Sequence, residues 1–251
     1  MKNKPYFHIL LAMFLLIACE KKDGNLNLPG KGASADGRDT GVLSIDSPVI
    51  VILGASTAYG TGSSPIDSSW VNRLRLTTAQ NPKPLTYINL ALGGYTTYQA
   101  MPTGFVSPIP NRPAPDPKRN ITKAISLHPD LVMITFPSHD VNQGFTGDEV
   151  INNYARIISL LDSAKVPYIL FGTQPKNFTE LSKRQELKSI NDRIRAIYGE
   201  RSNDYFDQIS TADLKIKPEY AYGDGTHLNN KGHKLIMNTV LNHAIFQKVI
   251  Q

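Results

Sequence analysis

Short apolar runs alternate with segments of helical periodicity along most of the chain. The runs are rich in β-branched residues and end at polar, Gly or Pro positions, which is typical of buried strands. They cover residues 49–53, 85–90, 131–136 and 168–171. Apolar residues also recur every three or four positions near residues 70–76, 150–161, 187–197 and 229–245. This alternation predicts an α/β fold in which helices cover both faces of a parallel sheet.

Chemistry-bearing residues follow the predicted strands. Ser56 comes after the first run, Gly94 after the second and Asp140 after the third. In a doubly wound sheet the carboxyl ends of the strands form the ligand crevice, so we expect these residues to gather at that edge. Asp224 and His227 lie just before the last predicted helix, and their loop could reach the same edge.

The N-terminal segment has a different pattern. Two lysines precede an apolar run at residues 9–18 that is too short to span a bilayer, which indicates a secretory signal over residues 1–18. The run ends in Leu-Ile-Ala-Cys, and Cys19 is the only cysteine. This end resembles the lipobox of bacterial lipoproteins, a resemblance that implies lipidation of Cys19 and cleavage before it. The alternative is an ordinary signal peptide that happens to contain a cysteine.

Residues 19–47 are mostly Gly, Asp, Lys, Asn and Ser, which predicts a flexible tether ahead of a folded domain over residues 48–251. The lipobox resemblance implies a protein of the cell envelope, held on a membrane through lipidated Cys19. Because Glu20 and not Asp follows the cysteine, the same resemblance favours the outer membrane, facing the periplasm or the cell surface.

The charge balance and the motifs exclude several classes of partner. The formal net charge is +6, with no basic run or aromatic-basic stripe, so we expect no nucleic-acid partner. No histidine lies in a metal-ligand pattern, and Gly60 and Gly62 are not followed by the Lys-Ser/Thr of a phosphate loop. We therefore expect no metal and no cofactor.

Ser56, Asp224 and His227 together have the residue types of a nucleophilic site. A serine on a sharp strand-to-helix turn supplies the nucleophile, and an Asp and a His three residues apart supply the orienting acid and the general base. The alternatives are structural: Ser56 as a helix N-cap, and residues 224–227 as a simple turn ahead of a helix.

Four blocks of sequence resemble the SGNH, or GDSL-type, hydrolases. They are residues 51–60, 89–97, 137–140 and 224–233. The resemblance implies a flavodoxin-like three-layer α/β/α sandwich with a central parallel sheet of about five strands. It also implies ester hydrolysis by a triad of Ser56, His227 and Asp224.

The same resemblance assigns the oxyanion hole. It implies that the backbone amides of Ser56 and Gly94 stabilise the tetrahedral intermediate. The family's third donor is an Asn side chain, and His139 occupies that position here. His139 could donate directly, Asn142 could take its place, or the third donor could be missing. Ala55 is a second departure, where family members usually have Asp.

The function that we expect is a lipid-anchored serine esterase that removes a small acyl group, such as acetyl, from a carbohydrate. Aromatic residues near the predicted site could pack on sugar rings; they are Tyr59, Tyr95, Tyr98 and Tyr222. One alternative is a lysophospholipase or thioesterase with the same mechanism. Another is a non-catalytic binding lipoprotein on a degenerate SGNH fold.

Residues 101–120 contain six of the seventeen prolines and are predicted to form neither a helix nor a strand over most of their length. Long ordered loops are often functional covers or binding walls. The alternative is a surface insertion without a functional role.

Overall fold

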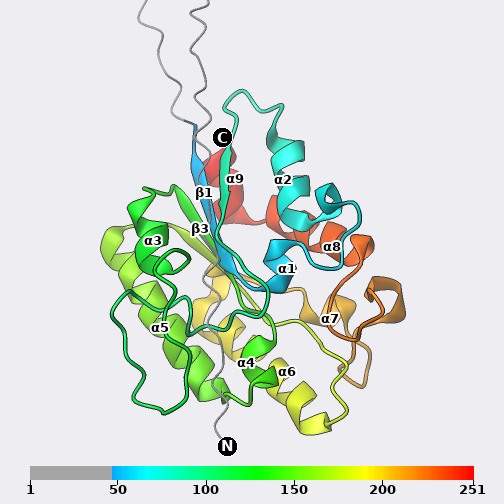
Figure 1. Ribbon diagram of the computed structural model, residues 1–251. Coiled ribbons are helices and arrows are strands. Elements are labelled where there is room, and N and C mark those ends of the chain that lie inside the picture. The colour runs from blue at the N-terminus through cyan, green and yellow to red at the C-terminus, as the bar shows by residue number, and fades with distance from the viewer. Residues whose placement is uncertain (1–46) are drawn as a thin grey trace, which may run out of the picture. The chain divides into compact units, whose positions relative to one another are not determined.

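The computed structural model describes residues 47–251, and its centre is a five-stranded sheet in which every neighbouring pair is parallel (Figure 1). The strands are β1 (Val49–Gly54), β2 (Thr86–Asn89), β3 (Leu131–Thr135), β4 (Tyr168–Phe171) and β5 (Ser202–Asn203). Their order is β2-β1-β3-β4-β5. The predicted signal peptide, Cys19 and all but the last residue of the predicted tether lie outside the described residues.

Helices cover both faces of this sheet. The longer ones are α2 (Trp70–Thr78), α3 (Ile121–Ser126), α5 (Gly147–Ala164), α6 (Leu181–Tyr198), α8 (Asn230–Leu241) and α9 (Ala244–Ile250). Val51 and Leu53 of β1 share a buried cluster with α3, α5 and α6. Ile50 and Ile52 share another with α2, α8 and α9. The result is a three-layer α/β/α sandwich, which confirms the predicted fold class.

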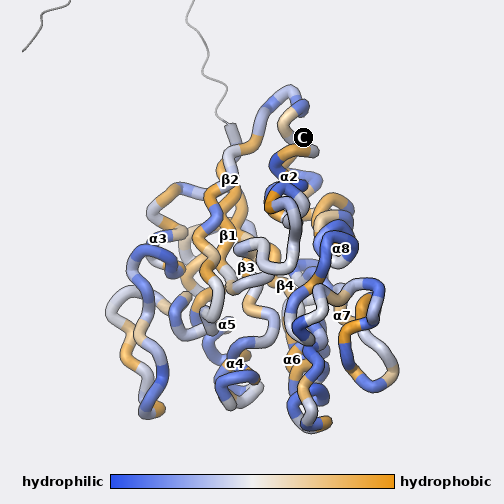
Figure 2. Tube along the Cα trace, turned by 45° about the vertical axis from the view of Figure 1, so that its right-hand side comes forward, coloured by the Kyte–Doolittle hydropathy of each residue, from blue (hydrophilic) through white to orange (hydrophobic). Residues whose placement is uncertain are grey.

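Hydropathy follows the same layers. Figure 2 shows hydrophobic residues along β1 and β3, while much of α6 and α8 is hydrophilic. The strands β1, β3 and β4 are buried from both sides, so they contain continuous apolar runs and not an alternating pattern. The strand β2, which was predicted from a similar run, is partly exposed because it lies at the edge of the sheet.

The strand order reverses between β1 and β3, and the two strands end together. Gly54 of β1 pairs with Thr135 of β3. A Cβ on Gly54 would lie 2.6 Å from the Thr135 carbonyl oxygen, so only glycine allows this close approach. The segments that leave β1 and β3 therefore start side by side, at the edge where a doubly wound sheet forms its crevice.

Three shorter helices follow the carboxyl ends of β1, β3 and β5: α1 (Ser56–Tyr59), α4 (His139–Asn142) and α7 (Phe206–Ile209). Short 3₁₀ turns occupy Ile66–Ser68, Gly199–Arg201 and Pro218–Tyr220. Within residues 47–251, none of the helices is both long and apolar enough to cross a membrane.

Three predicted helices differ in part from the structure. The helix expected over residues 229–245 begins where predicted, because Asn229 caps it, but it is two helices. The break comes at His243, which caps α9 by accepting a hydrogen bond from the Ile245 amide (3.3 Å). Two residues assigned to apolar helix faces, Leu76 and Ile197, are exposed.

The proline-rich segment 101–120 is irregular, as predicted, and is held by specific contacts. Arg112 forms an ion pair with Glu149 of α5 (2.6 Å) and lies over the Phe145 ring, 4.4 Å from its centroid. Asp116 accepts a hydrogen bond from the Tyr95 hydroxyl. The segment thus packs on α5 and supports the loop after β2.

Candidate active site

Ser56 is the first residue of α1, directly after the sharp turn that ends β1. Ala55 is the N-cap, and it makes no side-chain capping bond. The Ser56 hydroxyl instead lies 2.9 Å from Nε2 of His227. The interpretation of Ser56 as a helix cap is therefore wrong, and its side chain is free to react.

The loop before α8 carries both partners of Ser56. Oδ2 of Asp224 lies 2.5 Å from Nδ1 of His227. Oδ1 of the same carboxylate accepts the backbone amides of Thr226 and His227, both at 2.8 Å. Gly225 turns the chain with φ +71°, a conformation that favours glycine. The loop is thus built around the carboxylate and holds the imidazole against it.

The charge state of Asp224 fixes the tautomer of His227. Burial raises the pKa of Asp224, but the hydrogen bonds from His227 and Thr226 outweigh this and lower it to about 2. The ionised carboxylate accepts the Nδ1 proton of the imidazole. Nε2 is then the acceptor for the Ser56 hydroxyl, which is the arrangement that general-base activation of a serine needs.

The loop after β2 brings Gly94 to the same place. A Cβ on the adjacent Gly93 would lie 4.0 Å from Cβ of Ser56. Gly94 has φ +79°, so the turn favours glycine. Within residues 47–251, no backbone or side-chain acceptor bonds to the amides of Ser56 or Gly94. Two amides without acceptors beside a serine are suited to stabilise an oxyanion.

His139 and Asn142, the candidates for a third donor, both lie on α4 and line the cleft at Ser56. Burial, and then the charge of Lys176, lower the pKa of His139 below its usual 6.5, so the ring is neutral at pH 7. The Gln143 amide nitrogen donates to its Nε2 (3.0 Å), which leaves the ring proton on Nδ1. Oδ1 of Asn142 accepts from Lys176 (2.8 Å), and its amide protons remain available.

Asp140 lies at this edge of the sheet, as expected, but it is buried, with 2% of its surface exposed. It accepts hydrogen bonds from the backbone amide of Thr97 (3.1 Å) and from the Thr97 hydroxyl (2.6 Å). Burial raises the pKa of Asp140 to about 7. Because Thr97 continues the Gly94 loop, Asp140 ties that loop to α4.

The sequence patterns did not single out Gln174, which follows β4 and has 1% of its surface exposed. Its Oε1 accepts from the Thr57 hydroxyl (3.0 Å), and its Nε2 donates to the Thr226 carbonyl (2.8 Å). Thr57 and Thr226 each adjoin a member of the predicted triad. A polar residue three positions after a buried apolar run is a signal, but it does not indicate the partners.

A cleft of about 410 Å³ opens at the Ser56 hydroxyl. It is lined by Ala55, Ser56, Thr61, Gly93, Gly94, Pro137, Ser138, His139, Asn142, Lys176, Thr226 and His227. The lining thus contains Ser56, Gly94, His139, Asn142 and His227 of the predicted site, and Asp224 supports it through His227.

The four tyrosines predicted to pack on sugar rings are not among these lining residues. Tyr98 is buried and donates its hydroxyl to Glu149, so the prediction is wrong for this residue. Tyr59 and Tyr222 are exposed outside the lining. No residue of the segment 101–120 lines the cleft either, so the segment is not a wall of it.

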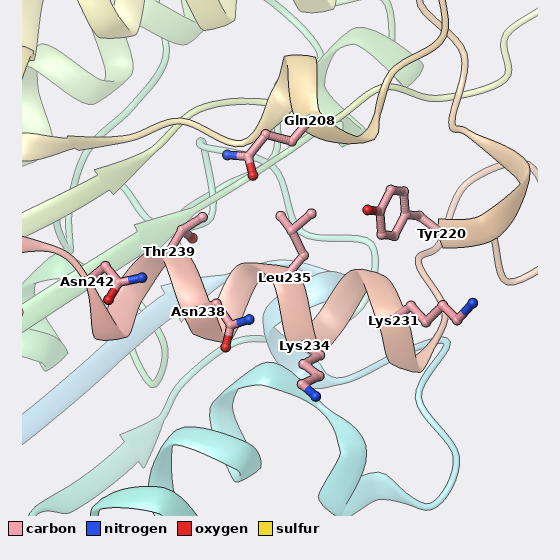
Figure 3. Close-up of a pocket in the computed structure, with 8 residues that line it drawn as sticks. All are labelled: Gln208, Tyr220, Lys231, Lys234, Leu235, Asn238, Thr239 and Asn242. Carbon is pink, nitrogen blue, oxygen red and sulfur yellow. The ribbon is translucent and has the colours of Figure 1, made fainter.

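A larger hollow, of about 670 Å³, lies along α8 and shares no lining residue with the cleft at Ser56 (Figure 3). It is lined by Gln208, Tyr220, Lys231, Lys234, Leu235, Asn238, Thr239 and Asn242. None of these eight residues is a carboxylate, a histidine, a serine or a cysteine, so the hollow does not contain the residue types of a Ser-His-Asp site. In the described part of the chain, no three His, Cys, Asp or Glu side chains are grouped as metal ligands.

A family model described as the GDSL-like lipase/acylhydrolase family matches residues 52–235, a range that includes Ser56, Gly94, His139, Asp224 and His227. No curated protein matches the chain.

Several solved structures are similar in fold. A lipase/acylhydrolase from Enterococcus faecalis is 18% identical, with a TM-score of 0.60, over 80% of this chain and 96% of that one. The psychrotrophic esterase EstA from Pseudoalteromonas sp., in a structure inhibited by monoethylphosphonate, is 17% identical, with a TM-score of 0.57, over 78% and 96%. A GDSL-like lipase from Bacteroides thetaiotaomicron is 21% identical, with a TM-score of 0.56, over 80% and 88%.

Proposed function

The chain belongs to the GDSL-like lipase/acylhydrolase family, and from this membership we propose that it hydrolyses esters through a triad of Ser56, His227 and Asp224. Membership makes the protein an SGNH-type serine hydrolase that acts on ester bonds. The observation that carries the assignment of the triad is the unbroken chain of contacts, 2.9 Å from Ser56 to His227 and 2.5 Å from His227 to Asp224.

In the proposed mechanism, Nε2 of His227 takes the Ser56 proton as Oγ attacks the acyl carbonyl carbon. The tetrahedral oxyanion accepts hydrogen bonds from the amides of Ser56 and Gly94, and we propose that His139 is the third donor. His227 then gives its proton to the leaving alcohol, which leaves an acyl group on Ser56. A water molecule, deprotonated by His227, attacks that acyl group and releases the acid.

We propose a short acyl group on a polar alcohol, such as acetyl on a carbohydrate. A long acyl chain needs an apolar channel. Apart from the two glycines, Ala55 and Pro137 are the only apolar residues that line this cleft. Glycines, hydroxyls and amides in the rest of the lining suit a hydroxylated alcohol. This polarity favours the esterase over the lysophospholipase or thioesterase alternative, and the contacts of the triad favour catalysis over a binding role.

The test is a series of p-nitrophenyl acetate, butyrate and octanoate, hydrolysed by the purified protein. We expect kcat/KM to be highest for acetate and to fall at least about 1,000-fold in Ser56→Ala, because removal of a triad member removes nucleophilic catalysis. Ser126→Ala is the matched control, since Ser126 is exposed on α3. Equal rates in the wild type and Ser56→Ala would contradict the proposal, and a preference for octanoate would contradict the short acyl group.

We also propose that the domain is held at the cell envelope by lipid on Cys19. The support is the sequence alone, in which an apolar run of signal-peptide length ends at Leu-Ile-Ala-Cys. Incorporation of radiolabelled palmitate in bacterial cells, and its loss in Cys19→Ala, tests this. Equal labelling of both forms would refute lipidation at this residue.

A further inference from the structure

Lys176 lies in the wall of the active-site cleft, a few residues after β4. Its Nζ donates to Oδ1 of Asn142 (2.8 Å) and lies over the Phe178 ring, 5.0 Å from its centroid. Both of these partners are neutral. An ammonium group has three protons to donate, so protons remain for a ligand in the cleft.

Among the described residues, Lys176 has no ion-pair partner. In the described part of the chain, no carboxylate oxygen lies within 4.0 Å of Lys176 Nζ, whereas Lys183 and Lys188 both form ion pairs. Asp224 attracts Lys176 from a greater distance, but its oxygens already accept from His227 and Thr226.

The positive charge of Lys176 acts on other groups that line the cleft. Burial lowers the pKa of Lys176, which reflects the cost of holding a partly desolvated cation. The same cation contributes to the lowered pKa of His139. Lys183 also lies over the Phe178 ring, 5.5 Å from the ring centroid, but it is paired with Glu180 (3.0 Å) and does not line the cleft. A negatively charged group that enters the cleft would relieve this cost.

We infer that Lys176 is a specificity-determining residue that binds an anionic group, such as a carboxylate, on the ester substrate. This inference rests on the proposed ester hydrolysis and narrows its substrate to acyl esters that are charged close to the scissile bond. Lys176 contacts the substrate and takes no part in proton transfer. The anionic group belongs either to the acyl part or to the alcohol part of the ester.

The experiment compares kcat/KM within two pairs of esters. The acyl pair is p-nitrophenyl hemisuccinate and p-nitrophenyl acetate. The alcohol pair is an acetylated methyl glucuronoside and the matching acetylated methyl glucoside. For one of the two pairs, we expect the ratio of the anionic to the neutral ester to fall about tenfold in Lys176→Gln, since a charge-assisted hydrogen bond is lost. The pair that responds identifies the part that carries the charge.

Two variants serve as controls. Lys176→Arg keeps the charge and should keep the ratio within about threefold of the wild type. Lys183 lies beside the same Phe178 ring but does not line the cleft, so Lys183→Gln should leave the ratio unchanged. In the wild type, 0.5 M salt should lower the ratio, because salt screens charge pairs.

An unchanged ratio in Lys176→Gln for both pairs would overturn the inference. So would an equal fall of kcat/KM for the neutral and the anionic ester, which would mean that Lys176 only supports Asn142. Hydrolysis of any of the four esters by the wild type separates the two proposals. If the wild type hydrolyses at least one of them, such results reject the role of Lys176 alone. If it hydrolyses none, the proposed ester hydrolysis fails, and this inference fails with it.

Discussion

Replacement of Gln174 by methionine should impair catalysis although Gln174 does not line the cleft. Methionine has a similar length and volume but makes no amide hydrogen bonds. The change removes the acceptor of the Thr57 hydroxyl and the donor to the Thr226 carbonyl. These bonds connect the residue after Ser56 with the residue before His227.

The magnitude follows from the burial of the two partners. Thr57 is buried, so in Gln174→Met its hydroxyl has no acceptor. This unsatisfied hydroxyl should lower the free energy of unfolding by about 1–3 kcal/mol. The Thr226 carbonyl is partly exposed and can bind water, which costs little. The effect on catalysis is larger than this loss suggests, because a displacement of about 1 Å at reacting groups costs about 100-fold in rate. We expect kcat/KM for p-nitrophenyl acetate to fall about 100-fold.

The assay measures kcat/KM and urea unfolding on the same samples of Gln174→Met. Gln185→Met, on the exposed side of α6, is the control for the change of residue type. Thr57→Val removes the bond at Thr57 but keeps the one to Thr226, so its activity should fall less. If folded Gln174→Met keeps kcat/KM within about threefold of the wild type, Gln174 does not position the triad.

Three further predictions concern the oxyanion hole and one buried histidine. Gly94→Ala and Gly104→Ala both place a side chain at positive φ in open space, so each should lower the free energy of unfolding by about 1–2 kcal/mol. Only Gly94→Ala should also lose esterase activity. Equal activities of the two variants would contradict the role of the Gly94 amide. His139→Ala should lower kcat about 100-fold, and His139→Asn should recover most of the loss; an alanine variant of normal rate would exclude His139 as a donor. Burial lowers the pKa of His233 from its usual 6.5 to about 4. As the pH falls, the unfolded chain therefore protonates this imidazole before the folded chain does. The stability due to neutral His233 is present above about pH 6.5 and is lost as the pH falls towards 4. Urea unfolding should therefore show the wild type losing about 3 kcal/mol more than His233→Gln between pH 7 and pH 4, and equal losses would contradict this.

Most of the fold and the triad could be predicted because the signals are local. Val49–Gly54, Leu131–Thr135 and Tyr168–Phe171 are buried on both faces and therefore read as uninterrupted apolar runs. The sequence indicates Ser56 and the loop at residues 224–227 because a nucleophile turn and an Asp-x-x-His spacing each occupy a few consecutive residues. Their meeting at one edge follows from the parallel order of the strands.

What could not be predicted depends on contacts between distant segments. β5 has only two residues, Ser202 and Asn203, both polar, so no apolar run marks it. Gln174 bonds to Thr57, 117 positions before it, and to Thr226, 52 positions after it. No local pattern of sequence indicates contacts over such separations. Tyr98 lies near Gly94 in sequence, but its hydroxyl points to Glu149 and not to the cleft.

The most direct test of the central claim is the site and rate of phosphorylation by diethyl p-nitrophenyl phosphate, mapped by mass spectrometry. The close contact of Ser56 with His227 makes the Ser56 hydroxyl the activated nucleophile. The wild type should acquire one adduct, on Ser56, and the rate should fall at least about 1,000-fold in His227→Ala, because the base that removes the proton is gone. An adduct on another residue, or the same rate of labelling without His227, would contradict the proposed relay.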